Sequence, residues 1–360
     1  MTSECPAPFH LKIQDEHCMT HAPTVLITGI LGQDGSYMAQ HALERGYKVV
    51  GGSRGIIDAE RCWRLRHLGI DGHVSFVPLD LGDPASIQAA LTSTRPDLIF
   101  NFAAQSSVGD SFKLPVETAN VGGMGALHIF EYARHADHRC RVFQASSSEI
   151  FGDITDSHHS EESFFNPKTP YGATKLFAHI MAEAYRASYG THVSTGILFN
   201  HESPLRGPNF VTKKVVQSMV AVKRGSLEGF SLGNLDARRD WSHARDFVDA
   251  MWRILQLDHP DNFVLASGRL TSVRDFVNLT ADALGIKLEW VGEGQGERGI
   301  DRRTGRTIVS VNPEFYRPYD PAQPIADTRK VRRLLDWHPP HSLRDLIQDM
   351  VDFELAHTPI

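Results

Sequence analysis

The stretch TVLITGILGQDGSYMAQHALERG, residues 24–46, decides the fold of this chain. It begins with a short β-branched run and then meets three glycines spaced as GxxGxxG, which are Gly29, Gly32 and Gly35. Apolar residues at helical spacing follow, so the order predicts a strand, a tight turn and a helix. Such a turn lets the backbone approach a pyrophosphate, and the amino end of the helix offers it N–H groups. The alternative is a glycine-rich turn that serves only packing.

Further apolar runs follow along the chain. They begin at Lys48, Val74, Asp97, Arg141 and His192, and helical segments lie between several of them. Strands that alternate with helices predict an α/β fold with a Rossmann-like, doubly wound parallel sheet. Ligands of such folds bind at the carboxyl ends of the strands.

Beyond about residue 200 the pattern breaks into pieces punctuated by glycine and proline. We expect a smaller, discontinuous C-terminal region there that binds the substrate. The expected division is a loose N-terminal extension at 1–22, a dinucleotide-binding Rossmann domain at 23–200 with a later contribution near 240–268, and a substrate-binding domain formed by 201–239 and 269–360.

The composition excludes several classes of function. The 360 residues are 41% hydrophobic and 22% charged, with a formal net charge of -6, which is ordinary for a globular protein. This charge predicts neither a nucleic-acid partner nor a membrane partner, and no apolar stretch approaches the roughly 20 residues that span a bilayer. The four cysteines lack metal-site spacing, so we expect no metal and a cytoplasmic location.

The residues after the second and third strands indicate the cofactor. A site for NAD carries an acid after its second strand, whereas a base at that position accepts the phosphate of NADP. Ser53 and Arg54 stand there, which favours NADP over NAD. Asp80 and Leu81 follow the third strand, where an acid can bind an adenine amino group. Small residues end the fourth strand and let a cofactor lie close, within the run Ala103, Ala104, Gln105 and Ser106.

Two further stretches contain candidate catalytic residues. QASSSEIFG, residues 144–152, carries Ser147 and Glu149, which lie on the same side if the chain there is extended. TPYGATKLFAH, residues 169–179, places Tyr171 and Lys175 on one face of an expected helix. A tyrosine is a poor base unless its pKa is lowered, and a lysine one helical turn away does this electrostatically, as does an oxidised nicotinamide. The plain alternatives are a polar loop after a buried strand and an exposed aromatic and cation pair.

Taken together, these stretches resemble the extended short-chain dehydrogenase/reductases and, within them, the GDP-mannose 4,6-dehydratase family. The resemblance runs from about residue 24 to 353 through LITGILGQDGSYMA, AAQSSVGDSF, QASSSEIFG, PYGATK, GILFNHESPLRGPNFVTKKV, SLGNLDARRDWSHARDFVDAMW and FYRPYD. Two positions depart from the family pattern. Ser147 replaces a threonine, so the hydroxyl stays but the methyl group that stiffens the rotamer is lost. Gly55 follows Arg54 where the family has a second arginine.

The resemblance implies a lyase of nucleotide-sugar metabolism that forms a deoxysugar precursor. It converts GDP-mannose to GDP-4-keto-6-deoxymannose with loss of water, by internal hydride transfer from carbon 4 to carbon 6 through bound NADP. Tyr171 takes the proton of the 4-hydroxyl, Ser147 holds that oxygen and Lys175 holds the nicotinamide ribose. The 4-ketone acidifies the carbon 5 proton, and Glu149 removes it. A reductase or epimerase has no use for Glu149, so this residue favours dehydration.

The resemblance also implies which residues hold the ligands, and it implies a homo-oligomer, either a dimer or a tetramer. For GDP these are Asn200, Lys214, Arg238, Arg317 and Asp320. For the cofactor they are Gly29, Gly32, Gln33, Asp34, Gly35, Arg54, Asp80, Leu81, Ala103, Ala104, Gln105, Ser106, Tyr171, Lys175, His201 and Arg206. Arg206 is expected to replace the phosphate contact of the missing second arginine.

Two other functions stay open from the sequence. The first is a relative that reduces or epimerises a nucleotide-sugar, or that dehydrates another GDP-sugar such as a GDP-heptose. The second is a non-catalytic NADP-binding scaffold or sensor, against which the complete set of Ser147, Glu149, Tyr171 and Lys175 argues.

Overall fold

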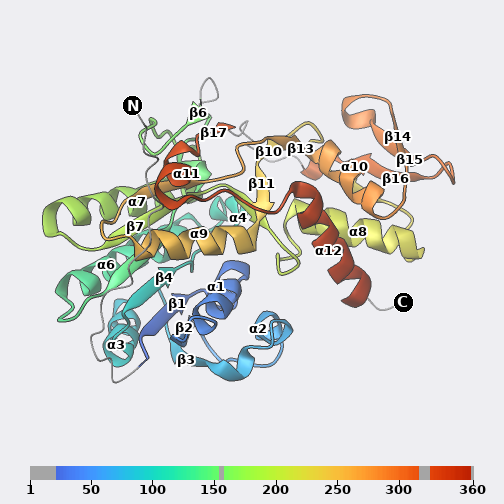
Figure 1. Cartoon of the computed structure of the whole chain (residues 1–360). Coiled ribbons are helices and arrows are strands. Elements are labelled where there is room, and N and C mark those ends of the chain that lie inside the picture. The colour runs from blue at the N-terminus through green and yellow to red at the C-terminus, as the bar shows by residue number, and fades with distance from the viewer. Residues whose placement is uncertain (1–21, 154–157, 316–324, 358–360) are drawn as a thin grey trace, which may run out of the picture.

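A seven-stranded parallel sheet forms the larger part of the molecule (Figure 1). The computed structural model describes residues 22–153, 158–315 and 325–357. The strand order is β12-β7-β5-β4-β1-β2-β3, and it reverses direction between β1 and β4. The strands are β1 (Thr24–Thr28), β2 (Lys48–Ser53), β3 (Val74–Pro78), β4 (Leu98–Asn101), β5 (Arg141–Ala145), β7 (Val193–Leu198) and β12 (Asn262–Leu265). The predicted doubly wound parallel sheet is therefore confirmed, and the strands expected before residue 200 are all present.

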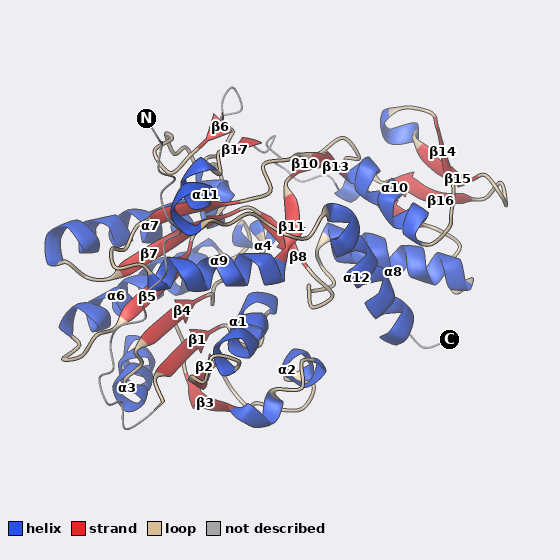
Figure 2. Cartoon of the chain, viewed as in Figure 1, coloured by secondary structure: helices blue, strands red, loops and turns tan. Residues whose placement is uncertain are grey.

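Helices cover both faces of this sheet (Figure 2). On one face lie α1 (Gln33–Leu43) and α9 (Ala244–Gln256), and on the other lie α3 (Pro84–Thr94), α6 (Gly125–His135) and α7 (Pro170–Tyr189). Because successive strand residues point to opposite faces, Ile27 faces α1 and α9 while Leu26 packs with α3, α6 and α7. This explains why the strands are nearly continuous apolar runs.

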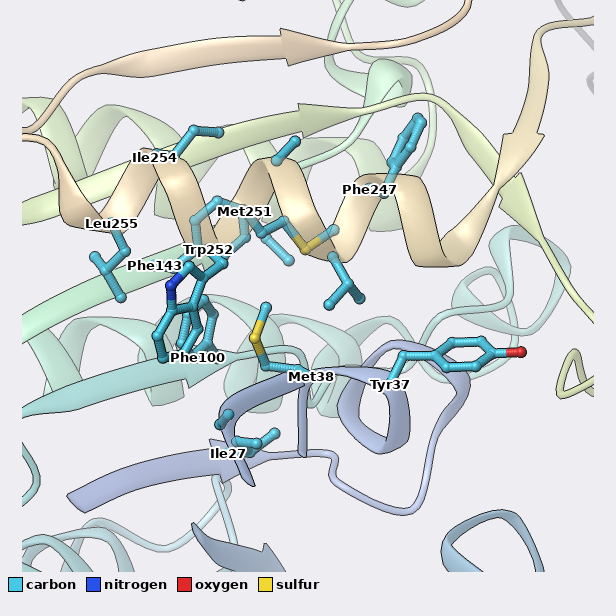
Figure 3. Close-up of a cluster of buried hydrophobic side chains, with 14 of the residues drawn as sticks. Ile27, Tyr37, Met38, Phe100, Phe143, Phe247, Met251, Trp252, Ile254 and Leu255 are labelled. Atoms are coloured by element: carbon cyan, nitrogen blue, oxygen red, sulfur yellow. The ribbon is translucent and has the colours of Figure 1, made fainter. Parts of the chain in front are cut away.

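Figure 3 shows the core beneath α9. Trp252 of α9 stacks on Phe100 of β4 with ring centroids 5.9 Å apart, and Met38 of α1 belongs to the same buried cluster. Both side chains of this aromatic pair are almost fully buried. The core thus holds α1, and with it the glycine turn, in a fixed place against the sheet.

A smaller lobe, at the right of Figure 1, has a hydrophobic cluster of its own. It consists of a four-stranded sheet in the order β14-β15-β16-β9 and three helices. Its elements are α8 (Val211–Arg224), β9 (Phe230–Leu232), α10 (Val273–Ala283), β14 (Leu288–Val291), β15 (Arg298–Asp301), β16 (Thr307–Val311) and α12 (Leu343–His357). By contrast, α11 (Arg329–Leu335) follows the small sheet in sequence but packs on the core of the large sheet through Val331 and Leu335.

Short paired strands complete the fold, and some of them frame the site between the two lobes. Strand β8 (Asn200–Glu202) pairs in parallel with β11 (Trp241–His243), β10 (Arg238–Arg239) pairs with β13 (Thr271–Ser272), and β6 (His158–His159) pairs with β17 (Ile325–Ala326). The remaining elements are α2 (Trp63–His67), α4 (Val108–Ser111), α5 (Pro115–Ala119), the π-helical turn η2 (Asn120–Met124) and the 3-10 turns η1 (Asp71–His73), η3 (Ser148–Ile150), η4 (Gly294–Gly296) and η5 (Pro313–Phe315). Among the described residues, no helix combines the length and the apolar character that a membrane crossing needs.

Candidate active site

The glycine turn between β1 and α1 leaves room for a ligand backbone. Gly29 has a φ of 67°, and a Cβ there would lie 3.0 Å from the amide nitrogen of Ala103. A Cβ on Gly35 would lie 2.4 Å from the Gly29 carbonyl oxygen, so α1 can pack against the turn only without a side chain. The N-cap residue Gly32 makes no side-chain cap, which leaves the amino end of α1 open to an anion. The turn therefore fits a dinucleotide pyrophosphate.

A first cavity of about 260 Å³ opens from this turn along the carboxyl ends of β1 to β4. Of the residues expected for the cofactor, those that line it are Gly29, Gly32, Arg54, Asp80, Leu81, Ala103, Ala104 and Gln105. The sequence did not single out two further lining residues, Arg61 and Glu117. Arg61 donates to Ser53 Oγ at 3.1 Å and to the Arg54 carbonyl oxygen at 2.7 Å. Glu117 lies 3.7 Å from the Arg54 guanidinium.

Arg61 gives this cavity a second positive charge beside Arg54, although Gly55 breaks the local arginine pair. The loop from residue 54 to 61 folds back so that the Arg61 guanidinium also binds the Ile56 carbonyl oxygen at 2.6 Å. A residue seven positions away on an irregular loop carries no periodic signal. Only the turn of that loop shows that the two guanidinium groups share one cavity.

A second cavity of about 590 Å³ lies between the two lobes and contains the four expected catalytic residues. Ser147 and Glu149 enter it from the end of β5, and Tyr171 and Lys175 enter it from the first turns of α7. Helix α7 begins here because Pro170 occupies its first turn and Thr169 Oγ1 accepts the Gly172 N–H at 2.9 Å. Among the expected cofactor residues, Asp34, Gln105, Ser106, His201 and Arg206 line this cavity as well.

The expected geometry of Ser147 and Glu149 is wrong, although both side chains line the same cavity. The chain after β5 is not extended but forms the 3-10 turn η3, and Ser147 is its N-cap residue. Ser147 Oγ accepts the Glu149 N–H at 3.2 Å. The two residues are thus brought together by a cap and a turn rather than by strand alternation.

The expected lowering of the Tyr171 pKa is also not found. Burial raises the pKa of Tyr171 to about 12, and the Glu149 carboxylate adds to this, while the Ser147 hydroxyl and Arg206 act in the opposite direction. Lys175 Nζ lies 5.7 Å from the Tyr171 ring centroid and donates to the Ala145 carbonyl oxygen at 2.8 Å. Burial lowers the pKa of Lys175 to about 8. As the pH rises, Lys175 therefore loses its charge before Tyr171 ionises. At neutral pH, Lys175 is an ammonium beside the neutral phenol of Tyr171.

The second cavity is also lined by two partly buried ion pairs. His201 Nε2 lies 3.0 Å from Asp34 Oδ2, and Arg206 Nε lies 2.8 Å from Glu202 Oε2. The Arg206 guanidinium also lies 3.5 Å over the ring centroid of Phe210. Burial disfavours the charged forms of Asp34 and His201, but their mutual attraction outweighs it, so the pKa of Asp34 falls to about 2 and that of His201 rises.

Several residues expected at the site do not line either cavity. Gln33 is buried and binds the His201 carbonyl oxygen at 3.0 Å, and Gly35 lies under the turn. Lys214 lies 3.9 Å over the ring centroid of Phe315, outside the lining residues. Arg238 is exposed, whereas its neighbour Arg239 lines the second cavity. Arg317 and Asp320 lie outside the described residues.

Of the residues expected for GDP, Asn200 lines the second cavity, and residues that were not expected lie beside it. Asn200 faces Trp241 across the β8 and β11 pair, which brings both into the lining. Asp110, Asn209 and Phe210 line it too. Alternation along the short strand β10 could have indicated that Arg238 and Arg239 point to opposite sides, but nothing in the sequence shows which side is the cavity.

Comparison with known proteins identifies the family. The family model described as GDP-mannose 4,6 dehydratase matches residues 26–350. The chain belongs to this family. The GDP-mannose 4,6-dehydratase of Sinorhizobium fredii (strain HH103) is 41% identical over 346 residues, covering 94% of this chain and 98% of that protein. The human GDP-mannose 4,6 dehydratase is 40% identical, and the match covers 92% of each chain. The resemblance inferred from the sequence motifs is thereby confirmed.

Solved structures agree with the fold of a GDP-mannose 4,6-dehydratase family member. The UDP-glucose 4-epimerase of Thermus thermophilus, solved with NAD, superimposes with a TM-score of 0.77 at 22% identity, over 93% of this chain and 100% of that one. The dTDP-glucose 4,6-dehydratase of Bacillus anthracis, also solved with NAD, has a TM-score of 0.74 at 17% identity, over 94% and 98% of the two chains. RMD of Pseudomonas aeruginosa, solved with NADPH, has a TM-score of 0.71 at 17% identity, over 93% and 100%. At these identities the likeness concerns the fold alone.

Proposed function

We propose that this chain is a hydro-lyase, an NADP-dependent GDP-mannose 4,6-dehydratase that forms GDP-4-keto-6-deoxymannose. The observation that carries the proposal is the presence of Glu149 in one cavity with Ser147, Tyr171 and Lys175. A hydroxyl, a phenol and an ammonium suffice to oxidise and reduce a sugar alcohol. A carboxylate in the same cavity adds the base that an elimination needs. The four side chains therefore include one, the Glu149 carboxylate, that a reductase does not require. A protein that only binds the cofactor requires none of the four.

Each side chain has a separate task in the reaction. Tyr171 removes the proton of the 4-hydroxyl while Ser147 Oγ holds that oxygen, and the Lys175 ammonium favours the phenolate through its charge. The resulting 4-ketone acidifies the proton on carbon 5, and Glu149 takes this proton and passes it to the hydroxyl on carbon 6, which leaves as water. When hydride adds to carbon 6, the proton that Tyr171 took from the 4-hydroxyl is returned at carbon 5. A nicotinamide cofactor held in these cavities would supply the redox chemistry, as acceptor of the hydride from carbon 4 and donor of it to carbon 6. The cofactor therefore ends each turnover in the oxidation state in which it began, and no external reductant is consumed.

The choice of NADP is supported by the end of β2. Arg54 and Arg61 line the first cavity at the position where a site for NAD carries an acid on the ribose hydroxyl. The Arg54 guanidinium offers paired N–H donors to a phosphate monoester. Arg61 adds positive charge beside it, because its own Nη donors bind Ser53 Oγ and the carbonyl oxygens of Arg54 and Ile56. Glu117 lies close enough to Arg54 to hold it in the absence of that phosphate.

The GDP portion of the substrate is assigned to the wall formed by β8, β11 and the start of α8. Asn200 and Arg239 line this wall and offer donors to a pyrophosphate, and Arg206 beside them remains the proposed cofactor contact. The roles of Lys214, Arg238, Arg317 and Asp320 rest on the resemblance to the family alone. Arg239 is the better candidate than Arg238, because only the former lines the cavity.

A homo-oligomer is supported by apolar side chains on the side of α7 away from the sheet. Phe112, Leu114, Val116, Met124, Phe177 and Ile180 are between 41% and 71% exposed. They lie on or beside α4, α5, η2 and α7, which contact one another. A surface of this kind is typical of an interface, and we assign it to a second copy of the chain. A cytoplasmic location is supported by the free thiols of Cys62 and Cys140.

One incubation tests the proposed activity. The purified protein, with GDP-mannose and NADP but no reductant, should convert the sugar nucleotide to a product lighter by one water that carries a ketone. A parallel incubation with a GDP-heptose identifies the preferred sugar. If GDP-mannose stays intact while added NADPH is oxidised, the chain is a reductase and the proposal fails.

A further inference from the structure

The first turn of α1 is fastened to β8, a strand that lies far away in the sequence. Gln33 Nε2 donates to the His201 carbonyl oxygen at 3.0 Å, and Ser203 Oγ donates to Gln33 Oε1 at 2.7 Å. Asp34 Oδ2 lies 3.0 Å from His201 Nε2, between residues 167 positions apart. Gln33, His201 and Ser203 are all buried. The turn that faces the cofactor and the strand that faces the substrate are thus one rigid unit.

The hydrogen-bond partners of His201 determine its charge. Its Nδ1 lies 2.7 Å from the Phe199 carbonyl oxygen, which can only accept, so Nδ1 carries a proton. Its Nε2 faces an ionised carboxylate, which also only accepts, so Nε2 carries the second proton. The ring stacks on Phe247 with centroids 4.7 Å apart, which excludes water from one of its faces. His201 is therefore an imidazolium held between two acceptors.

The charge of Asp34 matters because of where this residue stands. It lies in the first turn of α1, and the amino end of that helix is the part that attracts phosphate. An unpaired carboxylate at this place would repel the pyrophosphate of a dinucleotide. Arg206 also lowers the pKa of Asp34, but it is paired with Glu202 at 2.8 Å and its effect is smaller than that of His201. Most of the neutralising charge therefore comes from His201.

We propose that Asp34 and His201 form a positioning pair, in which the imidazolium cancels the carboxylate at the phosphate-binding end of α1 and locks that turn onto β8. Neither residue needs to act on the sugar. The pair sets the spacing between the cofactor half and the substrate half of the second cavity. This inference rests on the proposed function only in naming the cofactor as a nicotinamide dinucleotide.

A double-mutant cycle tests the pair without any sugar present. NADPH binding is measured by fluorescence titration for the parent, His201→Gln, Asp34→Asn and the double variant. His201→Gln leaves an unpaired carboxylate beside the phosphates and should raise the Kd by about tenfold or more. Adding Asp34→Asn to His201→Gln should bring the Kd for NADPH most of the way back to that of the parent. The Kd of the double variant should then be roughly 2- to 150-fold lower than the product of the two separate fold-changes predicts. If the two fold-changes instead multiply in the double variant, His201 is an independent cofactor contact and the proposal is overturned.

A similar pair elsewhere provides the matched control. His243 Nε2 lies 3.0 Å from Asp349 Oδ2, and neither residue lines the two cavities. Asp349→Asn should leave the Kd for NADPH within about twofold of the parent, since additivity holds for distant sites. A rise as large as that of His201→Gln would mean that any lost ion pair loosens the fold, and the proposal would fail.

A spectroscopic measurement on the parent protein gives an answer even if the variants fold poorly. The imidazole resonances of His201, assigned by through-bond correlations in the isotope-labelled parent, should report a doubly protonated ring at pH 7. A neutral ring at this pH would overturn the proposal. Failure of the proposed function is a separate result, because it would appear as a parent enzyme that binds NADPH normally but removes no water from GDP-mannose.

Discussion

Replacing Lys175 by glutamine should reduce the kcat for GDP-mannose dehydration by about a hundredfold. Its Nζ lies 5.7 Å from the Tyr171 ring centroid. The charge of a phenolate spreads from its oxygen into the ring, so the distance to the ring centroid serves as an approximate charge separation. At an effective dielectric constant of about 20, two unit charges this far apart attract by about 3 kcal/mol. This energy favours the phenolate that forms as Tyr171 takes the proton, and about 3 kcal/mol is roughly a hundredfold in rate. Burial has already raised the pKa of Tyr171 to about 12, so little phenolate forms without the Lys175 charge. The fall in kcat should therefore be easy to measure.

The pH dependence provides a second test of the same charge. Burial lowers the pKa of Lys175 to about 8. The ammonium is therefore present below this pH and is lost as the pH rises through it. The kcat of the parent should fall above about pH 8, and the fall should be missing in Lys175→Gln, which has no charge to lose.

The assay measures loss of water from GDP-mannose by mass spectrometry, at saturating NADP so that weaker cofactor binding does not lower the rate. Lys175→Met is the control, because glutamine can still donate to the Ala145 carbonyl oxygen and methionine cannot. If the charge matters, both variants lose activity to a similar extent. A glutamine variant within about threefold of the parent, or one far more active than the methionine variant, would refute the electrostatic argument.

Three further changes test the remaining parts of the site. Glu149→Gln should still bind GDP-mannose and still oxidise carbon 4, but net loss of water should fall on the order of a hundredfold or more, since the base for carbon 5 is gone. Tyr171→Phe should block oxidation as well, so reduced cofactor should form with Glu149→Gln and not with Tyr171→Phe, whereas unchanged dehydration by Glu149→Gln would show that this carboxylate is not the base. Arg54→Glu should weaken the preference for NADP over NAD measured by competitive titration, and a parent that binds both equally would contradict the cofactor assignment. Gly35→Ala should lose bound nucleotide and lower the Tm, because its Cβ would lie 2.4 Å from the Gly29 carbonyl oxygen, while Gly72→Ala, with nothing within 4 Å of the new methyl group, should leave both unchanged.

The sequence alone determined the features that depend on neighbours along the chain. The strand, glycine turn and helix at residues 24–46 follow from local rules, because side-chain periodicity and glycine conformation act within one or two turns. The spacing of Tyr171 and Lys175 is a local feature of the same kind, since residues four positions apart in any helix lie on the same face. These local signals, repeated along the chain, were sufficient to predict a doubly wound parallel sheet.

Tertiary structure alone decided the features that depend on burial and on distant residues. The Tyr171 pKa is raised rather than lowered because desolvation outweighs the neighbouring charges, and burial cannot be judged from spacing. Ser147 and Glu149 meet through a cap and a 3-10 turn, which the preceding apolar strand does not indicate. The pair of Asp34 and His201 closes across 167 positions. Such contacts arise only when the packed core brings two elements together, since the chain between them imposes no periodicity that a sequence pattern could reveal.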